Sequence, residues 1–156
     1  VAAIALAAPA GLSEPLRPAS TRHQPSASVH RPPVEAPVLD PFRPPPADQP
    51  WRPGNRGIEY DTEPGQTVRA SAAGTVTFAG SIGATRHVTV HHSLVLRTTY
   101  SFLRDVTVRR GQRVSQGQAI GTAGEAFHFG ALFDDVYIDP AMLFRAIPVR
   151  RVRLVA

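Results

Sequence analysis

Histidine is the residue type in this chain best suited to bind a metal ion or to move a proton near neutral pH. The chain has six histidines, and His128 lies between two phenylalanines in the segment GEAFHFGALFDD. Because the chain has no cysteine, disulfides, thiolate metal ligands and cysteine nucleophiles are all excluded. Two interpretations of His128 follow: a metal ligand or polar group of a groove, or a half-buried strand residue that packs and hydrogen-bonds.

The alternation of side chains along a β-strand predicts which neighbours His128 has. Successive residues point to opposite faces, so Phe127 and Phe129 share one face of the strand. Ala126, His128 and Gly130 share the other face. We therefore expect His128 to project among small residues, away from the phenylalanines.

The remaining histidines do not form an obvious metal site. His91 and His92 are adjacent, and in a strand they point to opposite faces, so they cannot bind one ion together. For His92 we expect a hydrogen bond that supports the fold, and for His87 a surface position at the start of a strand. His23 and His30 are isolated in a proline-rich segment and are not expected to be ligands.

The first third of the chain differs in composition from the rest. Thirteen of the 16 prolines lie within residues 1–53. Residues 1–11 indicate a truncated export signal, too short to span a bilayer, or else an alanine-rich disordered end. Residues 12–50 predict an extended, solvated linker. The folded domain is predicted for residues 51–156, and the expected localisation is export, either to the cell envelope or to the extracellular space.

The segment from residue 51 onward predicts an all-β fold. Short runs of Val, Thr, Ile, Phe and Tyr alternate with glycines at intervals of about ten residues. Only residues 140–146 favour a helical turn. We predict strands at 57–60, 67–70, 74–79, 86–92, 95–102, 105–108, 119–122, 127–131 and 136–138.

The charge pattern is basic but does not indicate nucleic-acid binding. All 17 basic residues are arginine, and the net charge is +5. No aromatic-interleaved basic stripe or groove-reading helix accompanies them, so we expect no nucleic-acid partner. Four arginines lie near the C-terminus and form a solvated face or a contact with an anionic wall polymer or partner: Arg145, Arg150, Arg151 and Arg153.

A short internal echo suggests two related halves. GQTV begins at residue 65 and GQRV at residue 111, and each is followed, about six residues later, by a glycine-led turn into an apolar strand. Two β-halves packed together would explain this repeat.

The phrase VTVRRGQRVSQGQAIGTAG is similar to sequences of two families with β-sandwich domains. One is the biotinyl/lipoyl carrier domain, whose cofactor is attached to a lysine; the chain has no lysine, so this function is excluded. The other is the lysostaphin-like, or LytM-type, zinc peptidoglycan endopeptidase. Three further phrases resemble it in order: PGNRGIEYDTEPGQTVRASAAGTVTFAG, HVTVHHSLVLRTTYSFL and AFHFG. The closing DVYIDPAMLF resembles its end.

This resemblance covers residues 51–147 and implies a duplicated-hybrid-motif β-sandwich of antiparallel strands. It also implies that the zinc-ligand positions are occupied here by Asn55, Glu59 and His128. An amide oxygen is a poor zinc donor compared with imidazole, and Glu is one methylene longer than the family's Asp. A weak zinc site is therefore the most that the resemblance implies, and no other cofactor is expected.

The resemblance further implies that two catalytic histidine positions are occupied by Phe102 and Ala126. Neither side chain can accept and return a proton, as peptide hydrolysis requires. His92, Glu125 and Asp134 are the only nearby candidates to replace them.

Two aromatic residues have an open assignment. Tyr100 and Trp51 either line the groove or belong to the core. His92 and Tyr100 together are expected to support the groove.

The sequence thus predicts an exported LytM-type domain that is not catalytic. We expect it to bind peptidoglycan or to regulate a cell-wall hydrolase, with no membrane span. The alternative is an active zinc metallo-endopeptidase that cleaves peptidoglycan cross-links. The oligomeric state is not predicted.

Overall fold

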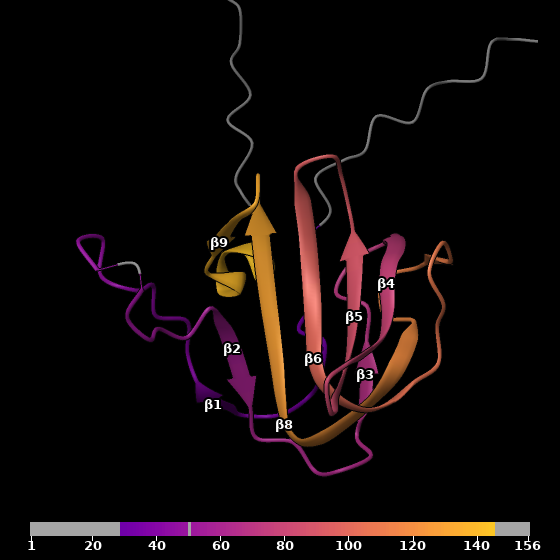
Figure 1. The fold of residues 1–156 in the computed structure, drawn as a ribbon. Helices are drawn as coiled ribbons and strands as arrows, with labels where there is room; N and C mark the ends of the chain where they lie inside the picture. Colours follow the sequence, from indigo (N-terminus) through magenta and orange to yellow (C-terminus); the bar gives the residue numbers. More distant parts are fainter. Residues whose placement is uncertain (1–28, 50, 146–156) are drawn as a thin grey trace, which may run out of the picture.

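The structure, a computed structural model, describes residues 29–49 and 51–145 (Figure 1). Residues 1–11, His23 and the C-terminal arginines beyond Arg145 lie outside the described residues. The described residues form nine strands and one 3₁₀ helix, η1 (Pro140–Phe144). The strands are β1 (Val38–Asp40), β2 (Gly57–Tyr60), β3 (Thr67–Arg69), β4 (Gly74–Ile82), β5 (Thr85–His91), β6 (Leu96–Val106), β7 (Arg113–Val114), β8 (Ala119–Phe133) and β9 (Val136–Ile138). Within this part of the chain, no helix is long and apolar enough to cross a membrane.

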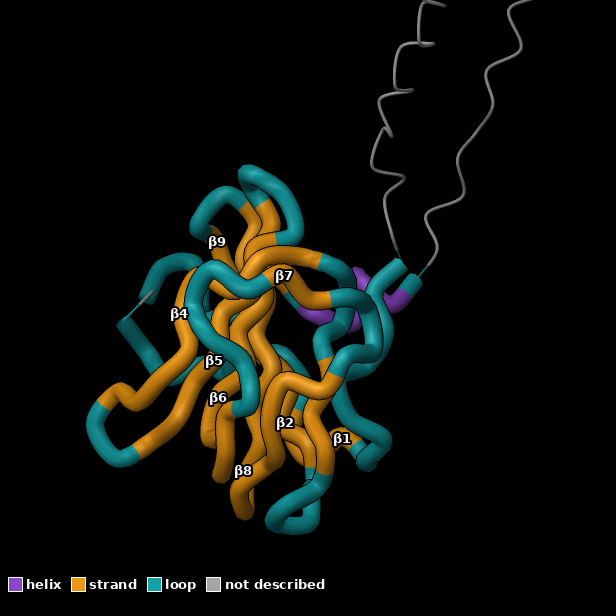
Figure 2. Tube along the Cα trace, turned by 90° about the vertical axis from the view of Figure 1, so that its right-hand side faces the viewer, coloured by secondary structure: helices purple, strands orange, loops and turns teal. Residues whose placement is uncertain are grey.

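All strand pairs are antiparallel, and the sheet order is β1-β2-β8-β6-β5-β4-β7. The 15-residue strand β8 organises the fold, because β3 and β9 also pair with it. Figure 1 shows β8 curving from the β3 side of the molecule into the central strands. Figure 2 shows the β4–β5 hairpin projecting from the sheet. The predicted all-β antiparallel fold is confirmed.

One face of the central strands forms the core. Alternating residues of β5, β6 and β8 are fully buried there, among them Val88, Val90, Tyr100, Phe127 and Phe129. Because side chains alternate in a strand, the residues between them lie on the opposite face. That opposite face carries the candidate site.

The predicted strand boundaries agree with the structure to different degrees. The predicted strands 57–60 and 136–138 have the observed bounds. The predicted pairs 95–102 with 105–108, and 119–122 with 127–131, are each one continuous strand, β6 and β8. Register shifts within the β6–β8 ladder explain why each of these strands resembles two in sequence.

The GQ echo marks a repeated turn. In each copy the glycine has a positive φ, and the glutamine side chain accepts a hydrogen bond from the backbone N–H three residues earlier. Gln66 Oε1 accepts from the N–H of Glu63, and Gln112 Oε1 accepts from the N–H of Arg109. A third copy, absent from the sequence prediction, has Gln118 closing on Ser115 around Gly117. Glycine is required because L-residues rarely adopt this backbone conformation.

The prediction of a solvated linker is wrong for its last part. His30, Pro33 and Val34 are buried, and β1 pairs with β2. The backbone N–H of Arg31 donates to Ser71 O (2.8 Å), and that of Arg69 donates to Pro33 O (2.8 Å). Proline has no N–H to satisfy, so a proline-rich segment can lie along the domain with few hydrogen bonds. The packed domain therefore includes residues from about position 30 onward.

This N-terminal segment is fixed by a buried polar network. His30 Nδ1 and Ser71 Oγ are 3.0 Å apart, and the Tyr100 hydroxyl donates to Ser71 Oγ (3.1 Å). Tyr100 in turn accepts from Thr98 Oγ1 (3.1 Å), which lies 2.8 Å from His92 Nε2. The His30 and His92 rings meet edge to face at 4.6 Å. His92 thus contacts both Thr98 and His30 within this network.

We expect the domain to lose stability as the pH falls from about 6.5 towards 4. Burial, with a smaller contribution from His92, lowers the pKa of His30 to about 4. Between these pH values His30 is protonated in the unfolded chain but neutral in the folded domain. Acidification therefore lowers the free energy of unfolding by up to about 3 kcal/mol. Urea unfolding from pH 4 to 7 measures the slope. His30→Gln should flatten it, whereas His91→Gln is the matched control; an unchanged slope in His30→Gln would contradict this assignment.

Candidate functional site

A groove of about 680 Å³ lies on the face of the sheet opposite the core. Its floor comes from the central strands, and its two sides come from the 51–56 segment and from the β4–β5 hairpin. Its lining residues are Asp40, Arg43, Trp51, Arg52, Pro53, Gly54, Asn55, Arg56, Glu59, Phe78, Ile82, His87, Thr89, Thr99, Ser101, Phe102, His128 and Tyr137.

The floor contains a row of polar residues that the strand register aligns. Asp40 pairs with Glu59, Glu59 with His128, His128 with Ser101, and Ser101 with His87. Directly paired residues project from the same face of a sheet, so these five side chains cross the groove in order from β1 to β5. Sequence reasoning placed Glu59 and His128 here, but it could not foresee the register that adds Asp40, Ser101 and His87.

His128 is half-buried and lies on the groove face, as strand alternation predicts. A Cβ atom added at Gly57 would stand 2.6 Å from His128 Cε1, so the imidazole ring occupies the space above this glycine. Burial lowers the pKa of His128, partly opposed by the charge of Glu59 and reinforced by His87. Burial therefore favours the neutral form of the ring.

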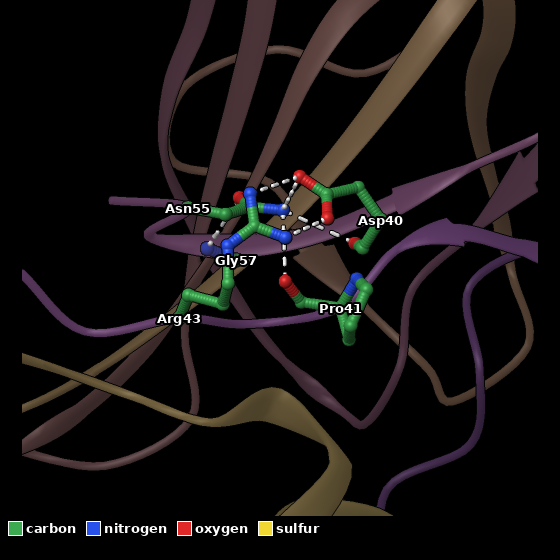
Figure 3. A network of polar contacts seen from close by, with 5 residues as sticks. All are labelled: Asp40, Pro41, Arg43, Asn55 and Gly57. Atoms are coloured by element: carbon green, nitrogen blue, oxygen red, sulfur yellow. Dashed lines mark hydrogen bonds and ion pairs between the residues drawn. The ribbon is translucent and has the colours of Figure 1, made fainter. Parts of the chain in front are cut away.

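Asn55 is engaged by the neighbouring backbone. Its Nδ2 donates to the backbone oxygens of Asp40 and Pro41 and to Asp40 Oδ2, each at 3.1 Å. Its Oδ1 accepts from the N–H of Gly57 (3.2 Å). Arg43 forms an ion pair with Asp40 at the same place (Figure 3). This network fastens the end of β1 and the following loop to the start of β2.

These residues do not fit a zinc ion. The amide oxygen of Asn55 already accepts a hydrogen bond, and its amide nitrogen holds three other acceptors. Glu59 and His128 supply two donors, whereas a catalytic zinc site takes three protein ligands and keeps one open position. Among residues 29–49 and 51–145, no group of three His, Cys, Asp or Glu side chains is arranged to hold a metal.

The two predicted catalytic positions differ in placement. Phe102 lines the groove with 43% of its surface exposed, and Ala126 is exposed in β8 outside the groove lining. Neither carries a group that moves protons. The three candidate replacements also lie outside the groove lining: His92, Glu125 and Asp134.

The two aromatic residues that could belong either to the core or to the groove lie in different places. Tyr100 is fully buried in the core, with its hydroxyl in the polar network, so it supports the groove floor from behind. Trp51 is 77% exposed and lines the groove. His87 also lines it, with Nε2 lying 2.6 Å from Thr85 Oγ1, although the sequence suggested only a surface position.

The comparison with protein-family models identifies the family of the chain. The model described as Peptidase family M23 matches residues 53–140, more than half of the chain. The chain belongs to peptidase family M23. The LytM-type resemblance and the β-sandwich of that family are thereby confirmed.

Two further proteins are similar to the chain in sequence. An uncharacterized protein of Mycobacterium tuberculosis is 34% identical over 131 residues, which cover 70% of this chain and 52% of the relative. A lipoprotein NlpD/LppB homolog of Pseudomonas aeruginosa is 38% identical over 72 residues, 45% of this chain and 24% of the lipoprotein. The chain spans about half the length, or less, of these relatives.

A solved structure supports the same fold. Csd3 of Helicobacter pylori is similar with a TM-score of 0.66 and 25% identity, over 76% of this chain and 35% of Csd3. The two proteins therefore share a fold over about three quarters of this chain.

Proposed function

We propose that this M23 domain is exported to the cell envelope and binds the peptide part of peptidoglycan in its groove without hydrolysing it. The observation that carries the proposal is the contrast between an open groove and the residues that line it. The groove has a volume of about 680 Å³, whereas Asn55 is hydrogen-bonded to the backbone and Phe102, which lines the groove, cannot transfer a proton. A binding function requires only the open groove.

The charges of the groove favour an anionic peptide. Arg43, Arg52 and Arg56 line it against Asp40 and Glu59, a balance of 3 − 2 = +1. Arg43 is paired with Asp40, and Arg56 lies over the Tyr137 ring at 5.6 Å. Peptidoglycan stem peptides carry carboxylates, so the two remaining arginines supply complementary charge.

We expect the full chain to sediment with purified peptidoglycan, and the double variant Arg52→Ala/Arg56→Ala to bind about 5-fold to 10-fold more weakly. Each exposed ion pair contributes a modest amount, and two together give this range. Binding should also weaken as salt rises. The matched control is Arg109→Ala/Arg110→Ala, two exposed arginines outside the groove. No sedimentation of wild type, or equal loss in both variants, would contradict binding in the groove.

The alternative function is an active zinc endopeptidase. It would need Asn55 to release the Gly57 N–H and turn its oxygen towards Glu59 and His128. It would also need a proton-transferring group that neither Phe102 nor Ala126 supplies. We therefore favour the binding function.

A further inference from the structure

Phe102 has an unusual backbone conformation for a large side chain. Its φ is +62°, in the left-handed region, where bulky residues are rarely found. Asp134 and Asp135 are the other described non-glycine residues with positive φ, and aspartate tolerates this conformation better than phenylalanine. Strain of this kind costs stability and is concentrated at functional sites.

At Phe102 the alternation of side chains along β6 is shifted, so that residues before and after it point to opposite faces of the sheet. The ladders of β6 with β5 and with β8 both shift register around it, between Ser101 and Leu103. Ser101 lines the groove and Leu103 is 5% exposed in the core, so these two residues lie on opposite faces although they are two apart. Phe102 is the additional residue, and it lines the groove next to Ser101.

The Phe102 ring lies between two imidazoles. Its centroid is 6.1 Å from His87 and 6.4 Å from His128, the latter in an edge-to-face arrangement. Burial lowers the pKa of both histidines, which favours their neutral forms. The ring itself remains 43% exposed.

Two further apolar residues of the groove lining lie on the same side as Phe102. Phe78 and Ile82 come from β4, and Ile82 is 60% exposed. The sheet order puts β4 and β6 on one side, whereas Asp40 and Glu59 come from β1 and β2 on the other. An exposed apolar surface gains free energy when a ligand covers it.

We propose that Phe102 is a specificity-determining residue, whose ring forms an apolar subsite for an alkyl side chain of the bound peptide. This inference rests on the proposed function, since it names what the peptide-binding groove selects. The positive φ at Phe102 then lowers the stability of the fold but directs the ring towards the ligand rather than into the core.

The test compares two soluble probes, N-acetyl-D-alanyl-D-alanine and N-acetyl-glycyl-glycine, by NMR titration of the full chain. Each methyl group that becomes buried adds about fourfold in affinity, so wild type should prefer the alanyl peptide by about that factor or more. Phe102→Gly should lose the preference, while its Tm stays equal or rises, because glycine adopts positive φ without strain. Phe102→Leu keeps an apolar surface and should retain the preference.

Asp134→Gly is the matched control, since it relieves a positive φ outside the groove. It should leave peptide preference unchanged. If wild type prefers the alanyl peptide and Phe102→Gly does so equally, the subsite is overturned. If Phe102→Gly lowers the Tm by several degrees, Phe102 is a structural residue instead. If wild type binds neither peptide nor peptidoglycan, the proposed function itself fails.

Discussion

The double substitution Asn55→His/Glu59→Asp should raise the affinity of the domain for zinc at least about 100-fold. Removing a group that only hydrogen-bonds to a metal ligand commonly lowers metal affinity 10–100-fold. A new side chain that binds the metal directly is therefore expected to raise the affinity by a larger factor. The variant would present two histidines and one carboxylate, which is a donor set that zinc accepts as a three-ligand site. Competition with a fluorescent chelator measures the change.

The same variant should become dependent on zinc for stability. Asn55 holds Asp40, Pro41 and Gly57 together, and histidine cannot replace all of these hydrogen bonds. We therefore expect a lower Tm without metal and recovery of the Tm when zinc is added. Asn55→Ala is the control, because it breaks the network without adding a ligand. A zinc affinity that rises equally in this control, or does not rise in the double variant, would contradict the ligand assignment.

Zinc binding alone should not restore hydrolysis. Phe102 and Ala126 remain, and each missing acid–base group commonly costs 10²–10⁴-fold in rate. Only the addition of Phe102→His and Ala126→His to the double variant is expected to give measurable release of peptides. Histidine is also more easily accommodated than phenylalanine at the positive φ of position 102.

Gly57→Ala should destabilise the domain by about 3 kcal/mol. An added Cβ would stand 2.3 Å from the backbone oxygen of Phe129 and 2.6 Å from Cε1 of His128. Backbone cannot move aside cheaply in a paired strand, so β2 must shift away from β8. Urea unfolding measures the loss, and the displaced His128 ring should appear as a changed imidazole NMR signal.

Gly80→Ala provides the comparison for this prediction. Gly80 is also a strand glycine, but an added Cβ there would meet only the Phe78 ring at 3.7 Å, an ordinary contact. It should change stability by well under 1 kcal/mol. Equal effects of the two substitutions would show that the ring of His128 does not occupy the space above Gly57.

The sequence predicted the part of the site that depends on local pattern. Alternation around Phe127 and Phe129 placed His128 on the groove face, because a regular strand needs no knowledge of its partners. The class of fold followed from the spacing of glycines and apolar runs. Position 102 could not be predicted in this way, since a register shift at Phe102 inverts the alternation that would have buried its side chain.

Long-range pairing explains what the sequence did not reveal. His87 and Ser101 join the groove only because the β5–β6 and β6–β8 registers align them with His128. The composition of the proline-rich segment predicted that it is solvated, yet His30 hydrogen-bonds with Ser71, which is 41 residues away in the sequence. Composition cannot predict such a contact, because it depends on where two distant segments meet.

Binding without cleavage is tested most directly on one sample of the full chain, in which both zinc content and peptidoglycan cleavage are measured. We predict that after mild dialysis the protein contains less than one equivalent of zinc. We also predict that it sediments with peptidoglycan and releases no more free peptide amines than buffer does. One equivalent of bound zinc, together with peptide release that a chelator abolishes, would show that the domain is an active zinc endopeptidase instead.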